Sequence, residues 1–311
     1  MLQILHDTKI PFMKYRRMAY MFSAIILIAT LGWFFVKGPK YSVDFTGGTL
    51  IEFATAPAVH PDAARAALDA AGFHGAEIQL STQKRPDGSI QNALLVRVQS
   101  DTTEARTAAE EMSAAIQKQS PGTKVELLSD SHVGPQVGNE LKQKAWLAIL
   151  SSLGVILLYV GWRYEFKFAL GGVVALLHDV LVTLGFLMFT GREISLTVVA
   201  ALLTIAGYSI NDTIVVFDRI RERSKMLRKE THSRVMDIAV NETLSRTVIT
   251  AFTVFLSAVA LFVWGGEVLH DFSFAMLVGT VFGTYSSVYV ASAIALDIWI
   301  ALDRQKGIQA E

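Results

Sequence analysis

Six long apolar runs dominate the pattern of hydrophobic and polar positions along the chain. The first covers residues 18–36 and follows a basic start. Five more come after a polar stretch, at residues 145–161, 168–190, 194–217, 247–265 and 272–296. Each is long enough, at about 17–25 residues, to cross a bilayer as a helix. The pattern therefore predicts an α-helical polytopic membrane protein with six transmembrane helices, one before and five after the polar stretch.

The first apolar run has an alternative interpretation as a cleaved signal peptide, because charged residues precede it. However, the run is long for that role and no convincing small-x-small cleavage site follows it. We therefore expect a retained first span, with the short segment 1–17 before it.

Residues 37–144 have the composition of a folded domain outside the membrane. Short β-type runs bounded by turn residues predict strands at 49–54, 76–83, 90–98 and 123–129, with a turn at 86–89. Helices are predicted at 60–71 and from a capping box at 101–104 to about residue 119. The order βαββαβ is that of a ferredoxin-like sandwich. Because this fold hosts many functions, it predicts a small folded module and no particular activity.

The basic residues predict the orientation of the chain. They gather in segment 1–17, in the segment 218–246 inside the five-helix region 145–300, and in the tail 301–311. By the positive-inside rule these segments and both termini lie in the cytoplasm, and domain 37–144 lies on the extracytoplasmic side. Arg192, in a short joint on the outer side, is the one exception among the short connections.

Composition excludes several classes of protein. Hydrophobic residues make up 52% of the 311 positions, which is too many for an ordinary soluble domain. The chain has no cysteine, so disulfides and thiolate sites are absent. Two intramembrane aspartates resemble an aspartyl protease pair, but the expected Gly-x-Gly-Asp context is missing, and so are nucleotide-binding, zinc-protease and serine-hydrolase motifs. We expect no enzyme, no metal site, no cofactor other than protons, and no nucleic-acid partner.

Asp212 is the strongest candidate for a functional residue. It lies inside the fourth apolar run, next to Ser209, Asn211 and Thr213. A carboxylate within the membrane costs about 2.5–3.5 kcal/mol on insertion scales, so it marks an ion or proton site by default. The structural alternative is a polar residue that bridges helices or reaches water at the interface.

Polar positions at helical spacing form two stripes. In the fifth span the stripe contains Arg246, Thr250, Thr253 and Ser257; in the fourth it contains Thr197, Thr204, Tyr208 and Asn211 or Asp212. The hydroxyls alone are typical of hydrogen bonds between membrane helices. With a charged residue on each stripe, the pattern favours a hydrated polar path between the two spans. Arg246 has a second interpretation, as an anchor whose side chain extends to the cytoplasmic interface.

Two further features lie in the third and sixth spans. His178 and Asp179 are adjacent, so their side chains point about 100° apart and are not expected to face one partner. His178 is either a titrating group or a hydrogen-bonded structural residue. Gly279 and Gly283 form a small-xxx-small motif, which allows close approach of another helix from the same or a different chain.

Four stretches carry a resemblance to one family. Residues 207–222 (GYSINDTIVVFDRIRE) closely resemble the signature of the SecF family of bacterial protein-export subunits. Residues 43–49 resemble the Asp-Phe-x-Gly-Gly motif that follows the first span in SecD and SecF. Residues 177–179 and 241–247 are similar to the family's third span and the entry to its fifth. The motif positions in residues 43–49 are Asp44, Phe45, Gly47 and Gly48.

The resemblance implies a partner and an energy source. SecF-like chains form one half of a twelve-span transporter of the resistance–nodulation–division (RND) type, with SecD as the other half. The pair acts with the SecY–SecE–SecG channel, with YajC and with the translocating unfolded polypeptide, in the lipid of the bacterial inner membrane. It uses the proton-motive force to promote late stages of translocation, after the SecA ATPase has acted.

Site roles also follow from the resemblance. Asp212 and Arg246 fall on the family's proton-coupling positions. The supporting polar path would contain His178, Asp179, Tyr208, Ser209, Asn211, Thr250 and Thr253. The turn of Gly47 and Gly48 is either a hinge or a structural connector. Two other functions remain open: a proton-coupled exporter of small molecules, and a passive assembly subunit of the translocon.

Overall fold

The computed structural model of the protein describes residues 8–74, 76–84, 90–98 and 105–305. The predicted turn at 86–89, the capping box at 101–104 and the tail beyond residue 305 lie outside these residues. The chain divides into two compact units. The helical unit comprises Met1–Lys40, Leu147–Gly265 and Leu269–Glu311, and the sheet unit comprises Tyr41–Trp146 with Gly266–Val268.

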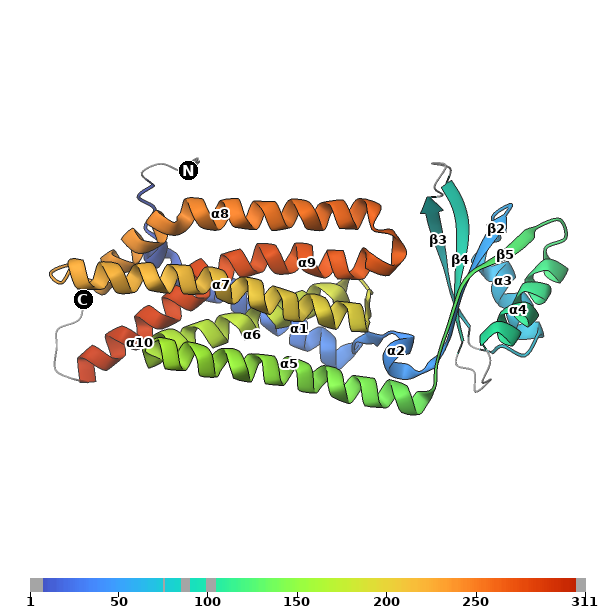
Figure 1. The fold of residues 1–311 in the computed structure, drawn as a ribbon, viewed down its shortest axis with the longest axis horizontal. Helices are drawn as coiled ribbons and strands as arrows, with labels where there is room; N and C mark the ends of the chain where they lie inside the picture. Colours follow the sequence, from blue (N-terminus) through green and yellow to red (C-terminus); the bar gives the residue numbers. More distant parts are fainter. Residues whose placement is uncertain (1–7, 75, 85–89, 99–104, 306–311) are drawn as a thin grey trace. The chain divides into compact units, whose positions relative to one another are not determined.

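Six helices in the described part of the chain are long and apolar enough to cross a membrane, as predicted. Figure 1 shows them as extended rods. The sixth is a continuous run of three elements, α9, η2 and α10, in which η2 is a π-helical turn. The elements are η1 (Phe12–Tyr15), α1 (Arg16–Val36), α5 (Pro135–Arg163), α6 (Phe166–Phe189), α7 (Leu196–Met226), α8 (His232–Trp264), α9 (Gly266–Ser286), η2 (Ser287–Ala291) and α10 (Ser292–Gln305), with short strands β1 (Lys40–Tyr41) and β6 (Glu193–Ile194).

The helices of the helical unit differ in how deeply they are buried. More than half of the most apolar stretch of α6 and of α7 is buried, at 61% and 56%, whereas only 11% of that stretch of α8 is. Small residues allow the close contacts. A Cβ added to Gly171 of α6 would lie 2.6 Å from the carbonyl oxygen of Ala291, and one added to Gly279 of α9 would overlap the side chain of Ile205 of α7. The helices therefore pack through glycines, as membrane helices commonly do.

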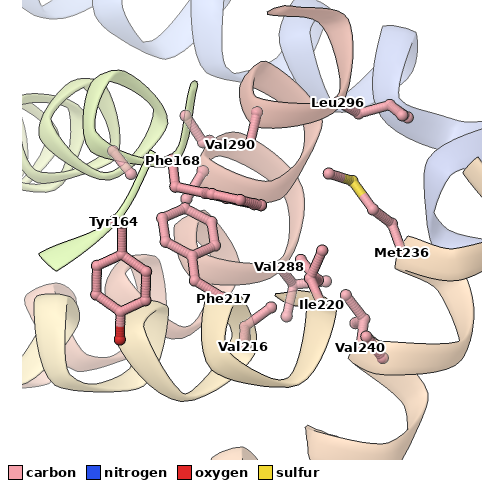
Figure 2. Close-up of a cluster of buried hydrophobic side chains, with 14 of the residues drawn as sticks. Tyr164, Phe168, Val216, Phe217, Ile220, Met236, Val240, Val288, Val290 and Leu296 are labelled. Carbon is pink, nitrogen blue, oxygen red and sulfur yellow. The ribbon is translucent and has the colours of Figure 1, made fainter. Parts of the chain in front are cut away.

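A cluster of large apolar side chains fills the bundle near the end of α7. Figure 2 shows Phe168 beside Phe217, with Met236 of α8 and Leu296 of α10 on the other side of the cluster. The rings of Phe168 and Phe217 lie 4.9 Å apart between centroids. This core joins α6, α7, α8 and α10 at one end of the bundle.

Polar contacts continue the same junction beyond the apolar core. Glu242 of α8 accepts hydrogen bonds from Arg219 Nε (2.7 Å) and from Arg223 Nη2 (2.6 Å), both on α7. The side chain of Asn241 accepts from the N–H of Ile10 and donates to its carbonyl, at 2.9 and 2.8 Å. These contacts fix the start of α8 against α7 and against the segment that precedes η1.

The sheet unit has the predicted order of strands and helices. The strands are β2 (Gly48–Ala56), β3 (Glu77–Lys84), β4 (Ile90–Val98) and β5 (Lys124–Val133), and the helices are the one-turn α2 (Val43–Thr46), α3 (Pro61–Ala70) and α4 (Ala105–Gln119). The sheet order is β3-β4-β2-β5, and every neighbouring pair is antiparallel. Ile51 and Phe53 of β2 pair with Val96 and Leu94 of β4. These side chains pack with Leu68 of α3 and Met112 and Ile116 of α4 in one buried cluster.

The contact between Gly279 and Ile205 gives a test of the packing. We expect Gly279→Ala to lower the free energy of unfolding by about 1–3 kcal/mol, because the new methyl group overlaps a fully buried side chain. Thermal unfolding of the purified protein in detergent measures the change.

A double variant and a matched control make this test specific. Ile205→Ala removes the atoms that the new methyl group would meet, so Gly279→Ala should cost less in that background. Gly207→Ala is the control, because a Cβ there has no neighbour within 4 Å. Equal losses from Gly279→Ala and Gly207→Ala would contradict the close contact.

Candidate functional site

Asp212 of α7 lies at the junction of three elements. Its side chain is buried, at 6% exposure. Oδ1 accepts a hydrogen bond from Thr247 of α8 (2.6 Å), and Oδ2 accepts one from Ser287 of η2 (2.5 Å). Both donors are neutral hydroxyl groups. A buried carboxyl group is thus stabilised by hydrogen bonds and has no ion pair among the described residues.

Asp179 of α6 forms a second buried carboxyl site. Its side chain is fully buried. Oδ2 accepts hydrogen bonds from Ser209 of α7 and Ser286 of α9, both at 2.6 Å. Oδ1 lies 3.0 Å from Nδ1 of His178. The site therefore links α6, α7 and α9 at the level where α9 meets η2.

The two carboxyl sites are neighbours along both α7 and the sixth helix. Ser209 and Asp212 are three residues apart, so they share one face of α7. Ser286 and Ser287 are consecutive, and each donates to a different aspartate. We call this arrangement the paired-carboxylate site. It consists of Asp179, Asp212 and the four hydroxyl groups that donate hydrogen bonds to them.

The π-helical turn η2 begins at Ser287, within this site. Ser292 Oγ donates to the carbonyl oxygen of Ser287 five residues earlier, at 2.9 Å. A π turn carries one more residue than an α turn and is frequent at functional sites. Here the turn begins at the second of the two serines that donate to the two carboxyl groups.

Arg246 does not contact Asp212 in the structure. Its side chain is exposed, and among the described residues its guanidinium group forms no ion pair or hydrogen bond. Its neighbour Thr247 makes the contact to Asp212 instead. The structure thus places the two predicted proton-coupling residues on adjacent helices without joining them.

Two hydroxyl groups of the α8 stripe donate to carbonyl oxygens of their own helix. Thr250 donates to the carbonyl oxygen of Arg246 (3.0 Å) and Thr253 to that of Thr250 (2.8 Å), both within α8. Both threonines are exposed. An open groove of about 310 Å³ runs beside the stripe, lined by Thr253, Val254, Ser257, Ala258, Leu261, Phe272 and Met276.

The other predicted path residues have different environments. Ser209 reaches Asp179, as described, but Asn211 is exposed. The hydroxyl group of Tyr208 is buried without a hydrogen-bond partner in the described part of the chain. Of the residues predicted on α7, only Ser209 and Asp212 are therefore in the paired-carboxylate site.

His178 and Asp179 contact each other as well as neighbouring helices. Their side chains hydrogen-bond to each other, although adjacent helical positions diverge by about 100°. The bond forms because both side chains extend far enough from the helix to turn toward one another. His178 also packs on Tyr285, with ring centroids 6.0 Å apart, while its Nε2 is buried without a partner among the described residues.

The Gly279 and Gly283 motif packs against α7 of the same chain. A Cβ on Gly283 would lie 3.3 Å from Cβ of Ser209 and 3.7 Å from Oδ2 of Asp179. The close approach therefore brings the sixth helix near enough for Ser286 to reach Asp179.

Thr247, Ser286 and Ser287 are site residues that sequence reasoning missed. Ser287 lies four residues after Gly283, at the next small-residue position of that motif. Two consecutive serines within an apolar run are a usable signal, because buried carboxyl groups need donors. The π turn brings each serine to its own aspartate. The spacing of hydrophobic residues in the sequence does not reveal this turn.

The Asp-Phe-x-Gly-Gly turn is closely packed within the sheet unit. The N–H of Asp44 donates to Ser42 Oγ (3.3 Å), and Phe45 is buried. Gly47 and Gly48 have φ values of +72° and +125°, which side chains disfavour. A Cβ on Gly138 of α5 would lie 2.9 Å from the nitrogen of Gly47. The turn therefore rests against the first turns of α5.

The chemistry available to the paired-carboxylate site is proton binding. A serine or threonine hydroxyl donates to a carboxylate and accepts from a carboxylic acid, so the same contacts serve both protonation states. In the described residues no three His, Asp or Glu side chains are grouped as metal ligands.

The chain is similar to proteins of the bacterial export machinery. The profile described as "Protein export membrane protein SecD/SecF, C-terminal" matches residues 112–300, and "SecD/SecF GG Motif" matches residues 32–59. "Protein translocase subunit SecF" of Vibrio alginolyticus is 43% identical, covering 100% of this chain and 97% of the relative. The subunit of the same name from Pseudomonas aeruginosa is 39% identical, covering 94% and 92%.

Solved structures agree with these sequence similarities. The crystal structure of SecDF, a translocon-associated membrane protein from Thermus thermophilus, has a TM-score of 0.84 and 38% identity. The match covers 97% of this chain but only 40% of that one, so this chain spans less than half of SecDF. A structure titled SecDF in super-membrane-facing form matches with a TM-score of 0.71.

The hydrogen bonds to Asp212 give a second prediction. We expect Ser287→Ala to lower the free energy of unfolding by about 1–3 kcal/mol, because it leaves a buried carboxyl oxygen without its donor. Asp212→Asn removes the negative charge, so the same serine change should cost less in that background. Chemical or thermal unfolding in detergent measures both values.

Ser273→Ala is the matched control for this prediction. Ser273 is also fully buried, but its hydroxyl donates to the carbonyl oxygens of Leu269 and His270 in its own helix. A loss for Ser287→Ala no larger than that for Ser273→Ala would count against a special role of the contact to Asp212.

Proposed function

We propose that this chain, which belongs to the SecD/SecF family of protein export membrane proteins, couples proton movement at Asp212 to protein translocation. As a member of that family it is a SecF-type subunit of the protein translocase. The observation that carries the proposed coupling is the burial of Asp212 among neutral donors from α8 and η2.

The proposed coupling rests on competition between burial and charge. Burial disfavours the ionised carboxyl group, whereas a cation nearby favours it. Arg246 lies one residue from Thr247, which donates to Asp212, so a rotation or shift of α8 would change the distance between the two charges. Each proton that crosses the membrane supplies about 2.3 kcal/mol per 100 mV. That energy biases a conformational change only if the two protonation states prefer different arrangements.

The second carboxyl group would extend the polar path. Asp179 is held by Ser209 and Ser286, which adjoin the residues around Asp212. His178 is hydrogen-bonded to Asp179 and would complete the path on the α6 side. Thr250 and Thr253 would line its α8 side, since both residues are exposed and follow Arg246 along that helix.

A SecD-like partner would cover the exposed face of α8 in this proposal. Three observations support that arrangement. Helix α8 is little buried, its polar stripe is exposed, and an open groove lies beside it. This chain also corresponds to only 40% of the SecDF chain, so most of that protein is supplied elsewhere. The SecY–SecE–SecG channel, YajC and the unfolded polypeptide would be further partners of the assembly.

The proposed setting is the bacterial inner membrane, with both termini in the cytoplasm. The basic segment at the end of α7 and the start of α8 supports this orientation. The sheet unit would then be a ferredoxin-like domain on the outer side. Its strand order β3-β4-β2-β5 and its two longer helices support that fold. The turn at Gly47 and Gly48 would act as the connection through which this domain responds.

Gradient-dependent export provides the test. We expect Asp212→Asn and Arg246→Met to abolish the part of translocation that an imposed proton gradient stimulates, because each removes one charge of the proposed pair. The measurement compares translocation with and without the gradient, in proteoliposomes that contain the channel, SecA and the SecD-like partner.

Ser151→Ala is the matched control, because Ser151 is an exposed residue of α5, outside both polar stripes, whose hydroxyl donates within its own helix. Equal assembly of all variants must be established by co-purification. If Asp212→Asn assembles and retains full gradient stimulation, the chain is a passive assembly subunit and the proposed coupling is wrong.

A further inference from the structure

A pocket outside the paired-carboxylate site lies between the ends of α1 and α6. It has a volume of about 490 Å³. It lies at the end of the bundle where α7 begins, away from the basic segment that joins α7 to α8. The residues that line it are Trp33, Lys37, Gly38, Lys40, Met188, Phe189, Thr190, Gly191 and Arg192.

Three of the lining residues are cations. Lys37 and Lys40 form no ion pair with any described residue, and the Lys37 ammonium lies 4.7 Å from the ring centroid of Trp33. Arg192 Nη1 donates to Asp271 Oδ1 at 2.6 Å and lies 2.9 Å from His270 Nδ1. The neighbouring carboxylates are Asp271, which pairs with Arg192, and Glu193, which follows Arg192 and begins β6. The two lysine ammonium groups, which have no ion pair among the described residues, are therefore the charges that attract an anion.

Arg192 has a donor that the protein leaves unused. Its guanidinium group is held by Asp271 and by the ring of Phe274, whose centroid lies 4.2 Å away. Its Nε is nevertheless buried without an acceptor among the described residues. Because Nε has almost no accessible surface, a ligand in the pocket would meet Nη2, which forms no hydrogen bond with a described residue.

The cationic side chains are not needed as hydrogen-bond donors to the last carbonyl groups of α1 and α6. At the end of α1, the carbonyl oxygen of Trp33 already accepts from the N–H groups of Lys37 and Gly38. At the end of α6, the N–H of Arg192 donates to the carbonyl oxygen of Leu187. Two helix C-termini together contribute about one negative charge, but their last carbonyl groups are already hydrogen-bonded and do not bind the lysine side chains.

Aromatic residues place the pocket at the boundary of the membrane. Trp33 and Phe189 meet edge to face, with centroids 5.5 Å apart, near the last turns of two apolar helices. Aromatic side chains at span ends lie at the level of the lipid headgroups. Lys37 and Lys40 follow α1 directly, so their charges lie at the depth of the lipid phosphates.

We propose that this pocket binds the phosphate group of an anionic phospholipid, with Lys37, Lys40 and Arg192 as its ligands and Trp33 beside the glycerol region. A pocket of this volume is in the size range of small-ligand sites and accommodates a headgroup. The site is separate from the paired-carboxylate site, and its occupancy does not depend on whether Asp212 couples protons.

Native mass spectrometry of the purified full chain in detergent tests this proposal. The probes are dioleoyl phosphatidylglycerol and dioleoyl phosphatidylcholine, titrated separately. We expect phosphatidylglycerol to bind more tightly, and the double variant Lys37→Gln, Lys40→Gln to bind it about tenfold more weakly, since each lysine near a lipid surface contributes to anion affinity. Both lysines are exposed, so this variant should fold, and its unfolding temperature verifies that.

The double variant Lys124→Gln, Lys144→Gln is the matched control, because it removes the same charge from exposed residues that do not line the pocket. Equal weakening by the two double variants, or equal affinity for the two lipids, would overturn the proposal. A third titration adds inorganic phosphate to the phosphatidylglycerol complex. Displacement of the lipid by phosphate at the same concentration would show a free-anion site and overturn the lipid assignment.

Discussion

The structure of the helical unit depends on the need to supply hydrogen bonds to carboxyl groups buried in an apolar bundle. Asp179 and Asp212 have no basic partner in the described residues apart from His178, so neutral hydroxyls on α7, α8, α9 and η2 provide the donors. A donor must lie within about 3 Å, which requires close helices. Gly279 and Gly283 permit that approach. The helices must therefore pack closely through small residues for the polar site to form.

Charged and polar residues outside the apolar core hold the helices and the N-terminal segment together. Arg219 and Arg223 hold Glu242, while Asn241 holds the segment before η1. Arg16 and Tyr20 of α1 similarly share Asp297 of α10, at 3.1 and 2.8 Å. The contacts of Glu242 and Asn241 anchor one end of α8, whereas the most apolar stretch of that helix is little buried.

Much of the fold follows from patterns that hydrophobic periodicity and turn residues carry. Six apolar runs predicted six helices, and alternating residues in 90–98 predicted β4. The depth of Asp212 in its run identified it as a site residue, because a carboxyl group so far inside an apolar helix is costly and must be compensated. The short helix that Ser42 caps in the turn before β2 was not predicted.

The remaining features depend on three-dimensional geometry that spacing does not encode. Ser286 and Ser287 serve different aspartates, because they lie where the helix changes from α to π geometry. The bond between His178 and Asp179 depends on side-chain torsions, whereas the predicted divergence considered only the backbone. The exposed position of Arg246 depends on how α8 packs, which its own sequence does not determine.

The hydrogen bonds between the N-terminal segment and α8 have a practical consequence for labelling this protein. Ile10 and Met13 are bound through their backbone N–H groups to Asn241 and Asp237 of α8, the helix that also carries Thr247. A fluorescent protein or affinity tag fused just ahead of Ile10 would lie close to that helix and would restrict its movement.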